Sequence, residues 1–161
     1  MEIVKVGMAD MNISCRVPSI LTTLGLGSCI GIALYDPTTK IAGLAHIMLP
    51  DSTQIKNNQN IAKFADTASI ELINRMVKVG ANKNKIVAKL AGGAQMFAFS
   101  SGNDMMKIGQ RNALASKEIL NKLGIRIISE DTGANYGRTI ELYTENGDLL
   151  IKTIGRGQKV I

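Results

Sequence analysis

The stretch Thr23-Leu24-Gly25-Leu26-Gly27-Ser28-Cys29 leads directly into an apolar run at residues 30–35. A short run that stays apolar on both faces is typical of a strand covered from both sides. Gly25 and Gly27 allow the backbone before it to take positive φ angles or to approach another group closely. The stretch therefore predicts a glycine-rich turn that places a cysteine at the mouth of a buried strand.

The next segment returns toward that cysteine. Residues 36–39 have the composition of a turn, and residues 41–48 form a second apolar run that contains His46, the only histidine in the chain. A hairpin of these two runs would bring His46 back to the end where Cys29 lies. Counted outward from the turn, the register predicts that Cys29 falls close to opposite His46.

The remaining pattern predicts two helices among short strands. Asn60 can cap an amphipathic helix over residues 61–79 that stops at Gly80, and a second helix is expected over residues 108–123. The chain should close with a hairpin that turns at Asn146-Gly147. We expect a single domain over residues 1–161, of the α+β class, with mainly antiparallel strands packed against two main helices.

Composition limits the partners. The net charge is +6, but the basic residues are scattered, Trp is absent and there are only three Phe and three Tyr to stack on bases. We therefore expect no nucleic-acid binding and favour an acidic protein partner. No apolar run approaches the length of a membrane span, and the first residues lack the pattern of a signal peptide. The sequence predicts a cytoplasmic protein without membrane insertion.

The chain has only two cysteines and one histidine, and structural zinc usually takes four such ligands, so a zinc site is not expected. We expect no metal and no organic cofactor. Cys15 has no glycine turn beside it and is interpreted as structural or incidental. In a reducing compartment both cysteines should remain thiols.

Cys29 and His46 suggest nucleophilic catalysis. A thiol is only slightly ionised at neutral pH, and a neighbouring imidazole can activate it for attack on a carbonyl carbon. Thr23 can orient the imidazole through its hydroxyl, and the loop at Gly27 and Ser28 can support a developing oxyanion. The alternative is that Cys29 and His46 only fill the core, which is the commoner use of a buried cysteine.

Six motifs resemble one family when taken in order along the chain. They are Thr23-Leu24-Gly25-Leu26-Gly27-Ser28-Cys29, Ala45-His46-Ile47-Met48-Leu49-Pro50-Asp51-Ser52, Ala65-Asp66-Thr67-Ala68, Gly92-Gly93-Ala94, Ile108-Gly109-Gln110-Arg111-Asn112 and Glu130-Asp131-Thr132-Gly133. Together they resemble the chemoreceptor glutamine deamidases, CheD. One departure is Ala134, where that family commonly has a second glycine.

The resemblance implies an amidohydrolase that converts glutamine side chains to glutamate in the cytoplasmic region of methyl-accepting chemotaxis receptors. It implies Cys29 as nucleophile, His46 as general acid and base, and Thr23 as the residue that orients His46. It also implies receptor methylesterase activity and an α/β sandwich that resembles the catalytic domain of deamidating bacterial toxins.

The family also binds CheC, a phosphatase of the phosphorylated response regulator CheY. Phe97 and Phe99 are apolar enough to serve as a docking surface for it. The competing hypothesis is therefore an interaction module that regulates CheC and the receptor by binding, with little or no deamidation. A monomer is the default expectation for the free protein.

Overall fold

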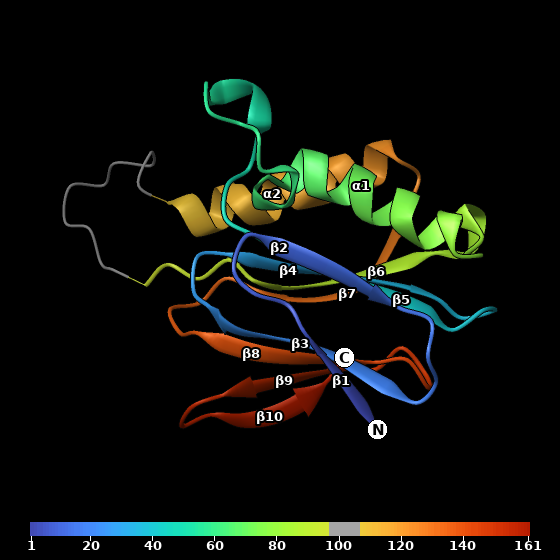
Figure 1. Cartoon of the computed structure of the whole chain (residues 1–161). Helices are drawn as coiled ribbons and strands as arrows, with labels where there is room; N and C mark the ends of the chain where they lie inside the picture. The colour runs from blue at the N-terminus through green and yellow to red at the C-terminus, as the bar shows by residue number, and fades with distance from the viewer. Residues whose placement is uncertain (97–106) are drawn as a thin grey trace.

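The chain forms three layers, with two helices above a five-stranded central sheet and a second five-stranded sheet below it (Figure 1). The structure is a computed structural model and describes residues 1–96 and 107–161. This arrangement confirms the α+β class and the two main helices. None of the helices in the described part of the chain is long and apolar enough to cross a membrane.

The central sheet has the strand order β2-β5-β4-β6-β7. Its strands are β2 (Asp10–Ser14), β5 (Ile41–Ile47), β4 (Ile30–Asp36), β6 (Val87–Gly92) and β7 (Arg126–Thr132). All neighbours are antiparallel except β6 and β7, which run parallel. Every residue of β4 and β5 is buried because helices cover one face of the sheet and the second sheet covers the other. The predicted buried hairpin is confirmed.

The outer sheet has the strand order β1-β3-β8-β9-β10. Its strands are β1 (Glu2–Lys5), β3 (Ser19–Leu26), β8 (Arg138–Tyr143), β9 (Leu149–Thr153) and β10 (Gly157–Val160). The sequence predicted the β8–β9 hairpin but not β10, whose four residues are all exposed and so show no alternation. β3 extends into the predicted glycine-rich turn, through Gly25 to Leu26, with an irregular register after Thr23.

The helices are α1 (Ala65–Lys78) and α2 (Ile108–Lys122), with short 3-10 turns at Ser52–Gln54, Ile61–Lys63 and Lys83–Lys85. The prediction that the first helix starts at residue 61 was wrong. Asn60 does cap a helical turn there, but Leu49 pairs with Phe64 as an isolated bridge. The carbonyl oxygen of Lys63 accepts from the Leu49 amide, so α1 begins only at Ala65.

Two apolar cores lie on either side of the central sheet. One joins it to the helices, with Leu72, Met76 and Leu120 among its fully buried side chains. The other fills the space between the sheets, and its members are Val6, Leu21, Leu26, Cys29, Ala33, Tyr35, Ala42, Leu44, Ala91, Ile140, Leu142, Leu149 and Ile151. Cys29 therefore belongs to the layer between the sheets.

Asp36 ends β4 and stabilises the fold. Burial alone would raise its pKa, but hydrogen bonds from Thr38, Asn82 and Thr39 outweigh burial and lower the pKa from 3.8 to about 2. A depressed carboxyl pKa contributes stability that is present above the unfolded pKa and is lost as the pH falls toward the folded one. We expect Asp36→Asn to lower the free energy of unfolding by about 2 kcal/mol at pH 7. Denaturant titrations should show this difference shrinking below pH 4, and a pH-independent difference would contradict the assignment.

Candidate active site

Three predicted site residues face the space between the two sheets. Thr23 lies on β3, His46 lies on β5, and Cys29 immediately precedes β4. Thr23 and His46 are each 1% exposed and Cys29 is 8% exposed. His46 shares its face of β5 with Ala42 and Leu44, which are members of the intersheet core. The fold thus brings the three side chains to one layer from separate strands.

The register of the hairpin differs slightly from the predicted one. Gly31 lies directly across from His46, and Ile30 pairs with Ile47. Cys29 is two residues before Gly31 on the same face of the sheet, so it is a diagonal neighbour of His46. A Cβ atom at Gly31 would lie 2.5 Å from Cδ1 of Ile140 and 3.2 Å from Cδ1 of Leu26. Glycine at this position lets the sheets approach closely beside the imidazole.

The hydrogen bonds of Thr23 determine the tautomer of His46. The Thr23 hydroxyl oxygen lies 2.7 Å from the carbonyl oxygen of Val6 and 2.7 Å from Nδ1 of His46. Since a carbonyl can only accept, the single hydroxyl proton is donated to Val6, and the hydroxyl oxygen accepts from Nδ1–H. The proton is therefore on Nδ1, which leaves Nε2 with a free lone pair. Nε2 is buried and has no hydrogen-bond partner among the described residues.

Burial acts on both members of the thiol–imidazole pair. It lowers the pKa of His46 below the ordinary 6.5. It also raises the pKa of the Cys29 thiol above 9.0, an effect that the backbone N–H of Cys29 opposes in part. Both shifts favour the uncharged forms. At neutral pH the Cys29 thiol and the His46 imidazole are therefore both uncharged.

The tautomer assignment gives a first prediction about Thr23. We expect Thr23→Val, which keeps the shape but loses the hydroxyl, to slow alkylation of Cys29 by iodoacetamide at pH 7 by about 10- to 100-fold. Thr23→Ser keeps the acceptor for Nδ1–H and should remain within a few-fold of the parent. The rates are measured by mass spectrometry of the Cys29 peptide. Equal rates in the two variants would show that the hydroxyl does not orient His46.

The glycine turn before Cys29 is held by backbone hydrogen bonds. The Gly27 amide donates to Gly25 at 3.0 Å, so Gly27 supports the loop rather than offering an amide to an oxyanion. The Gly27 carbonyl accepts from Ala94 at 2.8 Å, and the Cys29 carbonyl accepts from Gly93 at 2.8 Å. The Ser28 amide makes no hydrogen bond within residues 1–96 and 107–161. Of the two suggested positions, Ser28 is the one whose amide is available.

A second turn, at Gly133 and Ala134, bonds to the segment after β6, which in turn bonds to the glycine turn. Gly133 donates to the carbonyl of Gly92, and Ala134 accepts from the Gln95 amide at 2.9 Å. The buried Arg138 side chain donates to the carbonyl of Gly133 at 3.0 Å. Ala134 adopts a φ of 59°, a region in which a Cβ atom costs about 1 kcal/mol relative to glycine. Alanine therefore takes the same left-handed turn that glycine would form without that cost.

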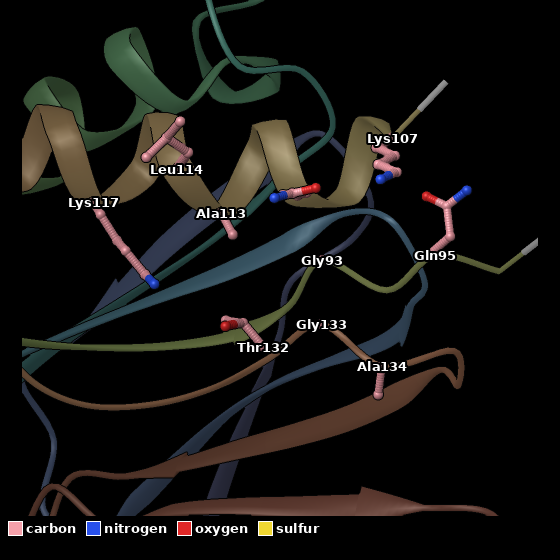
Figure 2. Close-up of a pocket in the computed structure, with 10 residues that line it drawn as sticks. Gly93, Gln95, Lys107, Ala113, Leu114, Lys117, Thr132, Gly133 and Ala134 are labelled. Atoms are coloured by element: carbon pink, nitrogen blue, oxygen red, sulfur yellow. The ribbon is translucent and has the colours of Figure 1, made fainter. Parts of the chain in front are cut away.

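A hollow of about 520 Å³ lies between α2 and the segments that follow β6 and β7 (Figure 2). Its lining residues are Gly93, Gln95, Lys107, Gln110, Ala113, Leu114, Lys117, Thr132, Gly133 and Ala134. None of these is an acid, a cysteine or a histidine, so the hollow is separate from the thiol and imidazole. One of its lining residues, Gly93, donates its amide to the Cys29 carbonyl.

Sequence reasoning gave no role to one residue that shapes the site, Asn112. Asn112 ends the motif Ile108-Gly109-Gln110-Arg111-Asn112, and its buried side chain donates to the carbonyls of Ser28 and Met48.

Cys15 is exposed and both cysteines are free thiols. Phe97 and Phe99 lie outside the described residues. Within the described part of the chain, no three His, Cys, Asp or Glu side chains are grouped so that they could hold a metal ion.

A buried thiol and an imidazole lie in one layer, and a hydroxyl binds Nδ1 of the imidazole. These are the residue types of a nucleophilic acyl-transfer site. Comparison with known proteins gives the family. Residues 48–153 match the CheD family, described as chemotactic sensory transduction. The chain belongs to the CheD family.

Its relatives are similar over their full length. The probable chemoreceptor glutamine deamidase CheD of Lachnoclostridium phytofermentans is 61% identical over 99% of both chains. The chemoreceptor glutamine deamidase CheD of Bacillus subtilis is 51% identical over 99% of this chain and 96% of that protein. Among solved structures, the hypothetical protein YfiH of Bacillus licheniformis is similar with a TM-score of 0.45 and 15% identity, over 78% of this chain and 51% of that one.

Proposed function

We propose that this protein deamidates glutamine side chains of chemoreceptors and that Cys29 is its nucleophile. The observation that carries the proposal is the hydrogen bond between the Thr23 hydroxyl and Nδ1 of His46. It leaves Nε2 as a proton acceptor in the layer that also contains Cys29. The substrate class comes from the relatives, which are named chemoreceptor glutamine deamidases.

The reaction begins when Nε2 of His46 takes the proton of the Cys29 thiol. The sulfur attacks the carboxamide carbon of a substrate glutamine and forms a tetrahedral oxyanion, which the Ser28 amide can stabilise. The imidazolium then gives its proton to the departing nitrogen, so ammonia leaves and a thioester remains.

A water molecule completes the cycle. Nε2 of His46 takes a proton from the water as its oxygen attacks the thioester carbon. The carbon–sulfur bond breaks, and the imidazolium returns the proton to the sulfur. The net change is one glutamine and one water converted to one glutamate and one ammonia. Thr23 remains hydrogen-bonded to Nδ1–H throughout, so the ring keeps its orientation.

The same acyl-enzyme route would accept a methyl ester of a receptor glutamate, with methanol leaving in place of ammonia. We include receptor methylesterase activity in the proposal on that chemical ground. Release of methanol from a methylated receptor fragment measures it directly. A protein that deamidates but releases no methanol would limit the activity to glutamine.

The cellular location and the CheC partner are proposed from the family resemblance. We propose a cytoplasmic protein, monomeric when free, that binds the CheC phosphatase. Co-sedimentation of the purified proteins tests the association with CheC and gives the oligomeric state of each alone.

The deciding experiment is mass spectrometry of a purified chemoreceptor cytoplasmic fragment after incubation with this protein. Each deamidation raises the mass of a peptide by about 1 Da and identifies the glutamine that has become glutamate. Conversion of particular glutamines is the expected result. Binding of the receptor or CheC without any conversion would favour the interaction module instead.

A further inference from the structure

We propose that Asn112 is a positioning residue that sets the separation between Cys29 and His46, a role that rests on the proposed cysteine mechanism. Asn112 lies on α2, and its side chain is completely buried. Its Nδ2 donates to the carbonyl of Ser28 at 3.0 Å and to the carbonyl of Met48 at 2.9 Å. One carboxamide nitrogen thus connects the residue before Cys29 to the chain just after His46.

Asn112 connects the two segments at a point where β4 and β5 are no longer paired. The pairing of β4 with β5 ends at Ile30 and Ile47, so Cys29 and Met48 both lie beyond the last pair. The Met48 amide donates to Lys63 at 2.8 Å, and the Cys29 carbonyl accepts from Gly93. Each segment is therefore bonded to a different neighbour, and Asn112 is the side chain that bonds to both.

The residue type fits this task. Two carbonyl oxygens need two N–H donors from one short side chain, and the NH₂ group of asparagine supplies them. An aspartate would present an acceptor to two other acceptors, and a serine hydroxyl could donate to only one of them. The carboxamide oxygen of Asn112 is buried without a hydrogen-bond partner among the described residues. Such an unpaired group is costly, so an apolar residue would be the better choice if packing were the only function.

The close packing of α2 against the segment after β6 brings Asn112 within hydrogen-bonding distance of Ser28 and Met48. A Cβ atom at Gly109 would lie 2.6 Å from the backbone carbonyl atoms of Gly93, so only glycine allows the helix to approach that closely. Gly93 in turn binds the Cys29 carbonyl. Gly109 therefore packs against the segment that bonds to Cys29, while Asn112 of the same helix bonds to Ser28, the residue before Cys29.

The test measures how strongly His46 assists Cys29. Iodoacetamide alkylation of Cys29 is followed at pH 7 and at pH 9. The rate at pH 7 is divided by the rate at pH 9, so that a change in the accessibility of Cys29 cancels. We expect Asn112→Ala to lower this ratio about 10-fold, toward that of an unassisted thiol. In the deamidation assay kcat should fall by about 10- to 100-fold with KM within about twofold.

Two control variants separate positioning from loss of stability. Ser116→Ala removes another fully buried polar group of α2, and Asp36→Asn destabilises the far end of β4. Both should keep the parent ratio. If Asn112→Ala does not fold, Asn112→Ser retains one donor and should give an intermediate ratio. A parent-like ratio in the folded Asn112 variant would overturn the proposal.

The same alkylation measurement distinguishes failure of the Asn112 proposal from failure of the proposed function. An assisted Cys29 in the parent protein together with an unaffected Asn112 variant would remove the positioning role alone. No assistance of Cys29 in the parent protein would remove the cysteine mechanism and the positioning role together.

Discussion

Replacing Cys29 with alanine is expected to abolish glutamine deamidation. Without the sulfur no thioester can form, and His46 would have to activate water against an unactivated amide. By comparison with other nucleophilic hydrolases, kcat should fall by about 10⁶-fold. Mass spectrometry of receptor peptides checks this, since both the extent and the position of conversion are read from the same sample.

Cys15→Ala is the matched control because it removes the other free thiol, which is exposed. It should keep the parent rate. Cys29→Ala should also retain its fold and its binding to the receptor fragment, because a small buried side chain is replaced by another. Deamidation that survives in Cys29→Ala would sink the proposed mechanism and leave the binding role as the better account.

The buried hairpin could be predicted from composition because its two strands are apolar on both faces. A strand that shows no alternation must be covered from both sides, and here the helices and the second sheet do so. The prediction that Cys29 and His46 lie at the same end of the hairpin needed only this pairing. Thr23 could be suggested because it opens the same glycine turn.

The fine geometry could not be predicted because it depends on distant parts of the chain. Gly31, rather than Cys29, lies across from His46, and Ile140 on the other sheet leaves no room for a Cβ atom at that position. Asn112 reaches Ser28 and Met48 from a helix far along the sequence. No local pattern distinguishes such an asparagine from an exposed one, since only the fold determines what its amide contacts.

His46→Gln should lower kcat by about 10²- to 10⁴-fold, the usual contribution of a positioned proton-transfer group. The variant should also change the pH dependence. His46 accepts a proton only when it is neutral, and burial lowers its pKa below 6.5. In the parent protein, activity should therefore fall only as the pH drops below 6.5. This acidic decline should be absent in His46→Gln, and rates measured from pH 5 to pH 9 will show it.

The direction of this change separates two states of the resting site. A preformed thiolate–imidazolium pair would lose activity as the imidazolium loses its proton above neutral pH. A neutral pair loses activity only when acid protonates Nε2. Burial disfavours both charged forms. An activity that declines between pH 7 and pH 9 would contradict the neutral pair. A retained activity there places the proton transfer in the step in which the sulfur attacks.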